Sequence, residues 1–279
     1  MSALPTLAAE TLFQLGPLPI TNSFVNTSLA TLGFCLFALF FSRTIRLAPG
    51  KGQLFVEGLV EKVLEYFDKV TNDRRLSRKF LPFAGTLFLF ILGSNWLGLF
   101  PGTGSIGMWQ IHEGQRVFIP LLRPANSDLN LTLGLAVLTV LTSHIIGITS
   151  TGFFSHIGRF FPLGAIWKGI KTAKPIAVLI GLVECLVGVI ELIAELAKMA
   201  SLSLRLFGNI FAGEVLTTVV ASIFAVGAPL PFIALELMVG AIQATVFTVL
   251  ALVYFTLFAR NAHGMTHAPD TLPTPQPAH

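Results

Sequence analysis

The residues in this sequence best suited to chemistry are charged and amide side chains inside long apolar segments. One segment holds seven of them and the next holds two: Glu184, Glu191, Glu195, Lys198, Arg205, Asn209 and Glu214, then Glu236 and Gln243. A charge at the centre of a membrane-spanning helix costs roughly 2.5–3.5 kcal/mol on insertion scales, so such residues face protein or water rather than lipid. Polar groups of this kind mark ion and proton pathways, and transport is therefore the first chemistry to consider.

The spacing of these residues places most of them on one face of a helix. The steps from Glu184 through 191, 195, 198 and 205 to Asn209 are 7, 4, 3, 7 and 4 residues. At about 100° per residue, these six side chains share a stripe about 80° wide. Glu214 lies about 120° or more away from most of them. Glu236, Gly240 and Gln243 form a shorter stripe on the following segment.

Arg205 is the most informative of these charges. Ion pairing between helices, or snorkelling to the interface, would explain Lys198 or Glu184 about as well as a functional role. The neighbours of Arg205 on the chain are Leu204, Leu206 and Phe207, which give its charge little support. A guanidinium keeps its proton at any working pH, so it cannot itself relay one. We therefore expect Arg205 to act electrostatically.

The composition identifies the class of protein that must position these groups. Hydrophobic residues make up 53% of the chain and charged residues only 11%. A soluble domain needs more charge to cover its surface, so the chain reads as membrane-embedded and all-α. Cys35 and Cys185 both lie in apolar runs and are expected to be packing residues rather than a disulfide.

A helix needs about 20 mostly apolar residues to cross the bilayer. Four segments fit this length: 24–41, 80–100, 129–148 and 231–258. The segment 175–226 would measure about 75 Å as one straight helix, so it is either two spans or one steeply tilted helix. The resulting division is an N-terminal segment 1–23, a first span 24–41, a helix pair with its loop 80–148, a long helical hairpin 175–258 and a disordered tail 259–279.

The loops give an orientation. Residues 42–79 contain nine Lys and Arg residues, and 149–174 contain four and no acidic residue, whereas 1–23 contain none. The positive-inside rule then places the N-terminus outside and the C-terminus in the cytoplasm, with five crossings. Residues 52–70 have apolar side chains at helical spacing opposite acidic ones, which predicts an amphipathic helix on the cytoplasmic interface or a solvated connector.

Four stretches of the sequence resemble subunit a of F-type ATP synthases. The most specific is Ser201-Leu-Ser-Leu-Arg-Leu-Phe-Gly-Asn209, followed by Ala212-Gly-Glu214. Ser94-Asn-Trp-Leu-Gly-Leu-Phe-Pro101, Pro124-Ala-Asn-Ser-Asp-Leu-Asn130 and Ala241-Ile-Gln-Ala244 are similar to the family at further positions. Glu236 stands where some members have His, and Met199-Ala200 where members often have Pro.

The resemblance implies a fold and a set of roles. Two long tilted C-terminal helices would form a hairpin against a ring of subunit c, with subunit b and the remainder of the F-type ATP synthase as further partners. Arg205 would be the essential gating charge between two offset half-channels. Protons would enter past Asn209, Glu214, Glu236 and Gln243, and would leave past Glu191, Glu184 and Glu195. The expected location is a bacterial inner membrane.

The alternatives differ in sequence features. A stand-alone secondary transporter or antiporter would also use buried Arg and Glu, but it predicts an internal repeat, which we do not find. The chain has no Gly-x-x-x-x-Gly-Lys-Ser/Thr loop, so we expect ATP to bind on a partner and the chain itself to be non-catalytic. We expect no cofactor, no metal and no nucleic-acid partner, and the lipid bilayer as its surroundings.

Overall fold

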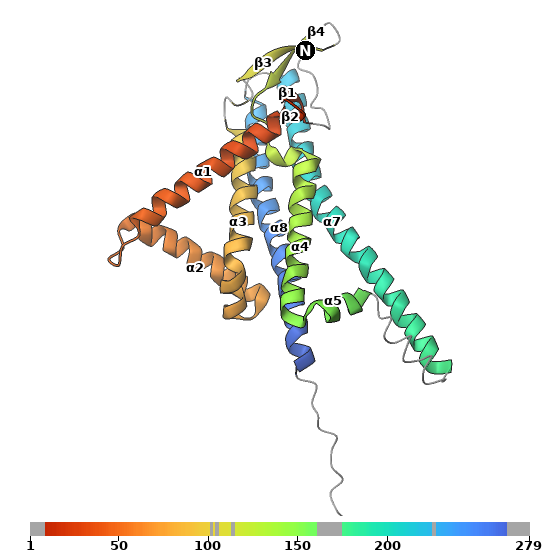
Figure 1. Ribbon diagram of the computed structural model, residues 1–279. Coiled ribbons are helices and arrows are strands. Elements are labelled where there is room, and N and C mark those ends of the chain that lie inside the picture. Colours follow the sequence, from red (N-terminus) through yellow and green to blue (C-terminus); the bar gives the residue numbers. More distant parts are fainter. Residues whose placement is uncertain are drawn as a thin grey trace, which may run out of the picture. The chain divides into compact units, whose positions relative to one another are not determined.

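The computed structural model describes residues 9–266 apart from 101–102, 104–105, 113–114, 161–174 and 225–226. Helices dominate this part of the chain (Figure 1). They are α1 (Asn22–Thr44), α2 (Lys51–Thr71), α3 (Arg74–Leu99), α4 (Leu129–Thr151), α5 (Phe153–Phe160), α7 (Pro175–Ile223) and α8 (Pro229–Thr266), with a short 3₁₀ turn η2 (Ala125–Ser127). The expected all-α polytopic membrane fold is confirmed.

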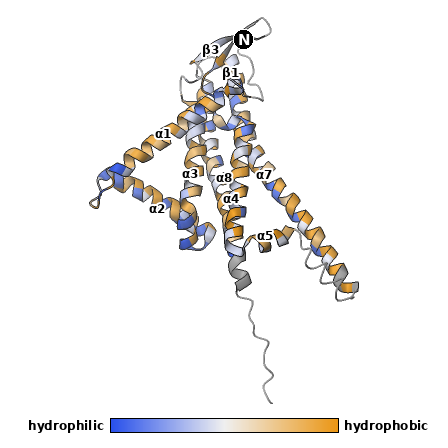
Figure 2. Cartoon of the chain, in the orientation of Figure 1, coloured by the Kyte–Doolittle hydropathy of each residue, from blue (hydrophilic) through white to orange (hydrophobic). Residues whose placement is uncertain are grey.

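Four helices are long and apolar enough to cross a membrane: α1, α3, α4 and α8. The ambiguous segment forms the 49-residue helix α7, uninterrupted at Met199-Ala200. The structure thus favours one long helix over two spans within Pro175–Ile223. Figure 2 shows hydrophobic residues over most of α1, α4 and α7, and hydrophilic residues gathered at the turns that flank α2. The count of five crossings stays a prediction.

Two β-hairpins lie in segments for which no secondary structure was predicted. Strands β1 (Thr11–Leu15) and β2 (Leu18–Thr21) pair antiparallel, as do β3 (Gly107–His112) and β4 (Gln115–Pro120). The first hairpin turns at Gly16, whose φ of 64° is accessible to glycine at no steric cost. Strands this short carry too little alternation to be told from loops by pattern alone.

The chain divides into two compact units. Unit 1 comprises Met1–Leu138 and Lys198–Leu252, and unit 2 comprises Thr139–Ala197 and Val253–His279. In unit 1, a buried amide clamp joins α1, α3 and the segment around η2. Asn26 Nδ2 donates to the carbonyl oxygens of Ser94 (3.2 Å) and Arg123 (2.6 Å), and Asn126 Nδ2 donates to Asn95 Oδ1 at 2.7 Å. These bonds fix the loop before α4 against α3.

The turn between α2 and α3, also in unit 1, is closed by local capping. Asn72 ends α2 in the left-handed conformation, and Asp73 caps α3 by accepting from the backbone N–H of Arg75. Arg74 forms ion pairs with Asp68 and Glu61 on α2. The polar residues between 68 and 78, whose charges served above only to orient the chain, therefore hold α2 and α3 together.

Unit 2 contains the end of α4, all of α5, the first part of α7 and the end of α8. Gly147 on α4 makes room for α5, because a Cβ there would lie 2.6 Å from Cε1 of His156. The ring of Phe258 on α8 is buried in the same place. Helix α8 continues to Thr266, so residues 259–266 are helical, whereas the sequence predicted a disordered tail from 259. Residues 267–279 lie outside the described part.

Candidate functional site

Arg205 lies on an exposed face of α7 in unit 1. Its Nη2 donates to Ser201 Oγ, one turn earlier, at 3.3 Å. Among the residues that the structure describes, no carboxylate forms an ion pair with it. The guanidinium is thus presented outward on an apolar helix with one hydroxyl as its recorded partner.

The two sides of α7 around Arg205 differ sharply. Leu202, Leu206 and Ile210 are almost completely buried against the rest of unit 1. The outward face carries Ser201, Arg205, Gly208, Asn209 and Ala212, all of which are exposed. Nothing lies within 4 Å of where a Cβ at Gly208 would be. Small residues on an exposed membrane face permit the close approach of another helix.

Asn209 and Gln243 connect α7 to α8. Asn209 Nδ2 donates to Gln243 Oε1 at 2.8 Å, and Gln243 is 4% exposed. The Nε2 of Gln243 is buried without a hydrogen-bond partner among the described residues. A buried amide N–H without a partner is costly, so this position suits a water molecule or a passing polar group.

Glu236 is the most buried acidic side chain of the predicted set, at 4% exposure. Its Oε2 accepts a hydrogen bond from Thr217 on α7 at 3.2 Å, and its Oε1 has no partner among the described residues. Gly213 makes room for this carboxyl group, because a Cβ there would lie 3.0 Å from Cδ and from Oε1. The glycine before Glu214 therefore sets the position of a carboxyl group on the neighbouring helix.

Glu214 is held by a residue that precedes η2. Arg123 Nε lies 2.8 Å from Glu214 Oε1 and 3.0 Å from Oε2, and Arg123 is 3% exposed. The guanidinium also lies 6.0 Å from the ring centroid of Phe211. A buried charge must be paired to be tolerated, so each of these two residues requires the other.

A cavity of about 300 Å³ in unit 1 brings the two glutamates together. Its polar lining includes Arg123, Glu214, Glu236, Thr217 and Thr218. Most of the remainder comes from the end of α3 and the segment between α3 and η2. Such a volume holds several water molecules, whose share of liquid volume is about 30 Å³ each. The cavity can therefore hold water against two carboxyl groups.

The three remaining predicted glutamates have different surroundings along α7. Glu184 is exposed, Glu191 is half-buried and Glu195 is 5% exposed. Within unit 2, Glu195 Oε2 lies 3.9 Å from Nε2 of His144, and His144 Nδ1 lies 3.1 Å from Nε2 of His156. Among the described residues, no group of three His, Cys, Asp or Glu side chains is arranged to hold a metal ion.

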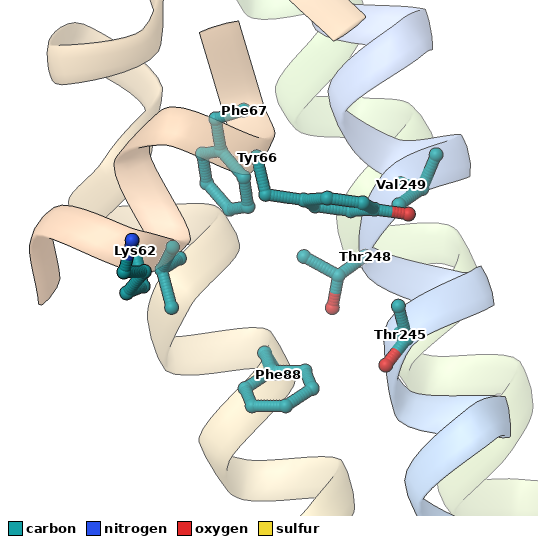
Figure 3. Close-up of a pocket in the computed structure, with 8 residues that line it drawn as sticks. Lys62, Tyr66, Phe67, Phe88, Thr245, Thr248 and Val249 are labelled. Carbon is teal, nitrogen blue, oxygen red and sulfur yellow. The ribbon is translucent and has the colours of Figure 1, made fainter. Parts of the chain in front are cut away.

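A second cavity of about 300 Å³ in unit 1 lies between α2, α3 and α8 (Figure 3). Tyr66 extends from α2 towards Thr248 and Val249 on α8, and Phe88 on α3 closes the other side. The lining is almost wholly apolar, and Lys62 at its edge is paired with Glu65 at 3.2 Å. None of the predicted site residues lines this cavity.

Sequence reasoning missed three site residues. Arg123 was not selected, although it directly precedes the motif that begins at Pro124. His144 stands inside an apolar span, and a titratable side chain there is a signal for function. His156 carries no comparable signal, because only the fold brings α5 against α4.

The comparisons with known proteins concern the family of the chain. Residues 24–256 match the family described as ATP synthase A chain. The chain is similar to "ATP synthase subunit a" of Mycobacterium ulcerans, at 34% identity over 85% of this chain and 86% of that protein. It is 30% identical to the subunit of the same name from Moorella thermoacetica, over 90% of this chain and 96% of that one. A second subunit a of a Bradyrhizobium species is 28% identical over 89% and 93%. The matched length and these identities show that the chain belongs to the ATP synthase A chain family, subunit a of the F-type ATP synthases.

Proposed function

We propose that this chain is the static proton-conducting subunit that faces a ring of subunit c, and that it supplies two offset half-channels separated by Arg205. The observation that carries the proposal is the outward guanidinium of Arg205. A charge on an apolar helix face requires an anion or water, and the described residues supply neither a carboxylate nor a second helix for it. The missing anion is the carboxylate of a ring subunit.

Arginine suits this gating role for a physical reason. Its guanidinium stays protonated, so it attracts an ionised carboxylate that passes it but does not carry a proton across. A lysine, whose pKa falls when it is buried, would lose its charge or leak protons. A proton that moves down the membrane potential releases about 2.3 kcal/mol per 100 mV. Because Arg205 blocks a direct proton leak between the half-channels, protons cross only as the ring rotates, and the released energy drives that rotation.

The half-channel through which protons enter follows the cavity of Glu214 and Glu236. Water in this cavity would meet both carboxyl groups, and the bonded pair of Asn209 and Gln243 would lie next on the path along α7 and α8. Glu236 Oε1 and Gln243 Nε2, which find no hydrogen-bond partner in the described part of the chain, support this assignment. Protons would then reach the ring on the outward face of α7.

The exit half-channel uses Glu191, Glu195 and Glu184 on the earlier part of α7. The burial of Glu195, with His144 3.9 Å away, supports its place in this path, whereas the exposed Glu184 would act at the end of the path. The N-terminus would lie outside and the C-terminus in the cytoplasm of a bacterial inner membrane. Subunit b and the ring would be direct partners, and ATP would be made or hydrolysed elsewhere in the complex, so that this chain is not itself catalytic.

Cysteine crosslinking in native membranes tests the ring interface. Cys35 and Cys185 are first replaced by Ser, and a single Cys is then placed at Gly208 or Ala212, on the exposed face. Its partner is a Cys series on the outer helix of subunit c. Leu206→Cys is the matched control, because that side chain is fully buried on the opposite side of α7. Crosslinks at 208 and 212 that stop ATP-driven pumping, and none at 206, are expected.

No crosslink at any exposed position in a correctly inserted complex would reject the ring interface and favour a stand-alone transporter. The Arg205→Ala variant provides an independent check. We expect it to abolish ATP-coupled proton pumping while the complex still assembles, because α7 keeps its buried side. Pumping at the normal rate would contradict the gating role.

A further inference from the structure

The structure contains a chain of three titratable groups in unit 2, two of them buried and the third, His144, 22% exposed, that the assignments above use only in part. Glu195 on α7, His144 on α4 and His156 on α5 come from three different helices. His144 Nε2 faces Glu195 Oε2 at 3.9 Å, and the other ring nitrogen, Nδ1, lies 3.1 Å from His156 Nε2. Glu195 and His156 are 5% and 6% exposed.

The two nitrogens of the His144 ring thus meet two different partners. Imidazole is the side chain that accepts a proton on one nitrogen and releases another from its second nitrogen near neutral pH. At 3.1 Å, one of the two facing ring nitrogens must donate and the other accept. At 3.9 Å, the gap between Glu195 and His144 is closed by a small side-chain rotation or by one bridging water.

The surroundings hold these rings in place. His144 and His156 both contact the rings of Phe160 and Phe258, at centroid separations between 5.2 and 5.8 Å. Gly147 permits the approach, because a Cβ there would lie 2.6 Å from His156 Cε1 and 3.0 Å from Phe258 Cδ1. These apolar rings flank the two histidines and hold their facing nitrogens in position for transfer.

We propose that Glu195, His144 and His156 form a proton relay in the exit half-channel, which rests on the proposed function. The protonated carboxyl of Glu195 gives its proton to His144 Nε2, and the imidazolium then releases its Nδ1 proton to His156 Nε2. His156 returns a proton to water. One proton enters at Glu195 and one leaves from His156. His144 regains its starting tautomer when water takes its Nε2 proton and supplies one at Nδ1.

The direction of the relay agrees with the loop charges. His156 lies in the segment after α4, residues 149–174, which the positive-inside rule assigns to the cytoplasm. The helices of the relay also carry Glu191, four residues before Glu195 on α7, and Arg260, two residues after Phe258 on α8. Neither of these charges is a step in the relay.

Passive proton conduction in membranes stripped of the catalytic sector tests the relay, with a potassium diffusion potential as the driving force. We expect His144→Phe and His156→Phe to keep the aromatic packing and to lower the conductance roughly tenfold or more, because a positioned proton carrier typically contributes 10²–10⁴-fold. The double variant should be no slower than the slower single variant. Ser155→Ala, at the exposed neighbour of His156, is the control and should conduct normally.

Rescue by added imidazole distinguishes proton transfer from packing, because imidazole can carry a proton but cannot replace the packing of a missing ring. In His144→Ala or His156→Ala membranes, added imidazole should restore conduction, and it should do nothing in Glu195→Gln membranes. Normal conduction in both Phe variants, or a loss in the Ala variants that imidazole does not restore, would overturn the relay. Arg205→Ala, measured beside them, separates the two proposals: loss of coupled pumping in this variant retains the gating role whatever the histidine variants do.

Discussion

Arg123 Nε lies 2.8 Å from Oε1 of Glu214, and both side chains are largely buried in unit 1. The two residues are 91 positions apart in the sequence. The pair joins the segment before α4 to the last part of α7, and it also borders the cavity that Glu236 shares. Its role is therefore both structural and, under the proposed function, part of the path by which protons enter.

Replacement of one member of this pair should lower the free energy of unfolding more than replacement of both members does. Arg123→Met leaves the Glu214 carboxylate buried without its cation, which typically destabilises a protein by about 3–5 kcal/mol. Arg123→Met combined with Glu214→Leu should recover most of that loss, because no charge is left unpaired. Thermal unfolding of the purified complex in detergent measures both effects.

The same double variant should remain deficient in proton conduction, because Glu214 is a titratable wall of the cavity. A double variant that recovers stability and also conducts normally would show that the pair is structural only. Glu214→Gln alone, which keeps the shape of the side chain, is the matched control for the loss of titration.

Gly213→Ala should impair conduction with little loss of stability. The added Cβ would lie 3.0 Å from the carboxyl group of Glu236, which ends a flexible side chain and can move by a few tenths of an ångström. The substitution also favours the helix by roughly 1 kcal/mol. Initial rates of passive proton uptake should fall while the unfolding temperature stays near that of the parent.

Gly134→Ala on α4 is the control for this substitution. No atom lies within 4 Å of the position that its Cβ would take, and the residue is exposed. It should raise helix stability in the same way and leave conduction unchanged. Equal proton conduction in the two glycine variants would show that Gly213 has no role in the proton path.

The sequence predicts the helices of this fold well, because about 20 apolar residues between polar loops have few alternatives in a membrane. It also places Arg205 and Asn209 on one face of α7, since helix phase follows from residue spacing alone. Burial did not follow from spacing: Glu184 and Glu195 share the predicted stripe, yet one is exposed and the other buried. The helices that cover α7 differ along its length, and that information lies in tertiary contacts.

The same reason explains the residues that the sequence did not reveal. Arg123 meets Glu214, and His144 meets His156, only because loops and helices distant in the sequence pack together. The β-hairpins escaped notice because their strands are at most six residues long. Helical continuity to Thr266 was hidden by the polar composition of the tail.

Gly98→Ala should prevent normal folding, unlike the same change elsewhere on α3. A Cβ at Gly98 would lie 2.5 Å from both Cα and N of Pro124, and this backbone is fixed by the amide clamp at Asn26 and Asn126. Overpacking against rigid neighbours typically costs about 1–3 kcal/mol, and occasionally more. Gly85→Ala is the control, because its nearest neighbour would be a side-chain atom of Leu81 at 3.9 Å. The amount of assembled complex in membranes, measured by immunoblotting, should fall for Gly98→Ala and should stay unchanged for Gly85→Ala.

The stability of the turn between α2 and α3 should depend on pH through Asp68. The nearby Ser77 hydroxyl and the Arg74 guanidinium hold the pKa of the Asp68 carboxyl below its ordinary value. A carboxyl whose pKa is lowered by folding stabilises the folded state above its unfolded pKa of about 3.9. That stabilisation is lost as the pH falls from about 4 through the lower folded pKa of Asp68.

Limited proteolysis with an acid-stable protease measures this effect. Cleavage at the turn should be faster for Asp68→Asn than for the parent at pH 7, and the two rates should converge as the pH is lowered below about 4. Glu65→Gln, which removes an exposed carboxylate from the same helix, is the control and should leave the pH dependence unchanged. A difference between Asp68→Asn and the parent that persists undiminished in acid would show that shape or hydrogen bonding, rather than the charge of Asp68, closes the turn.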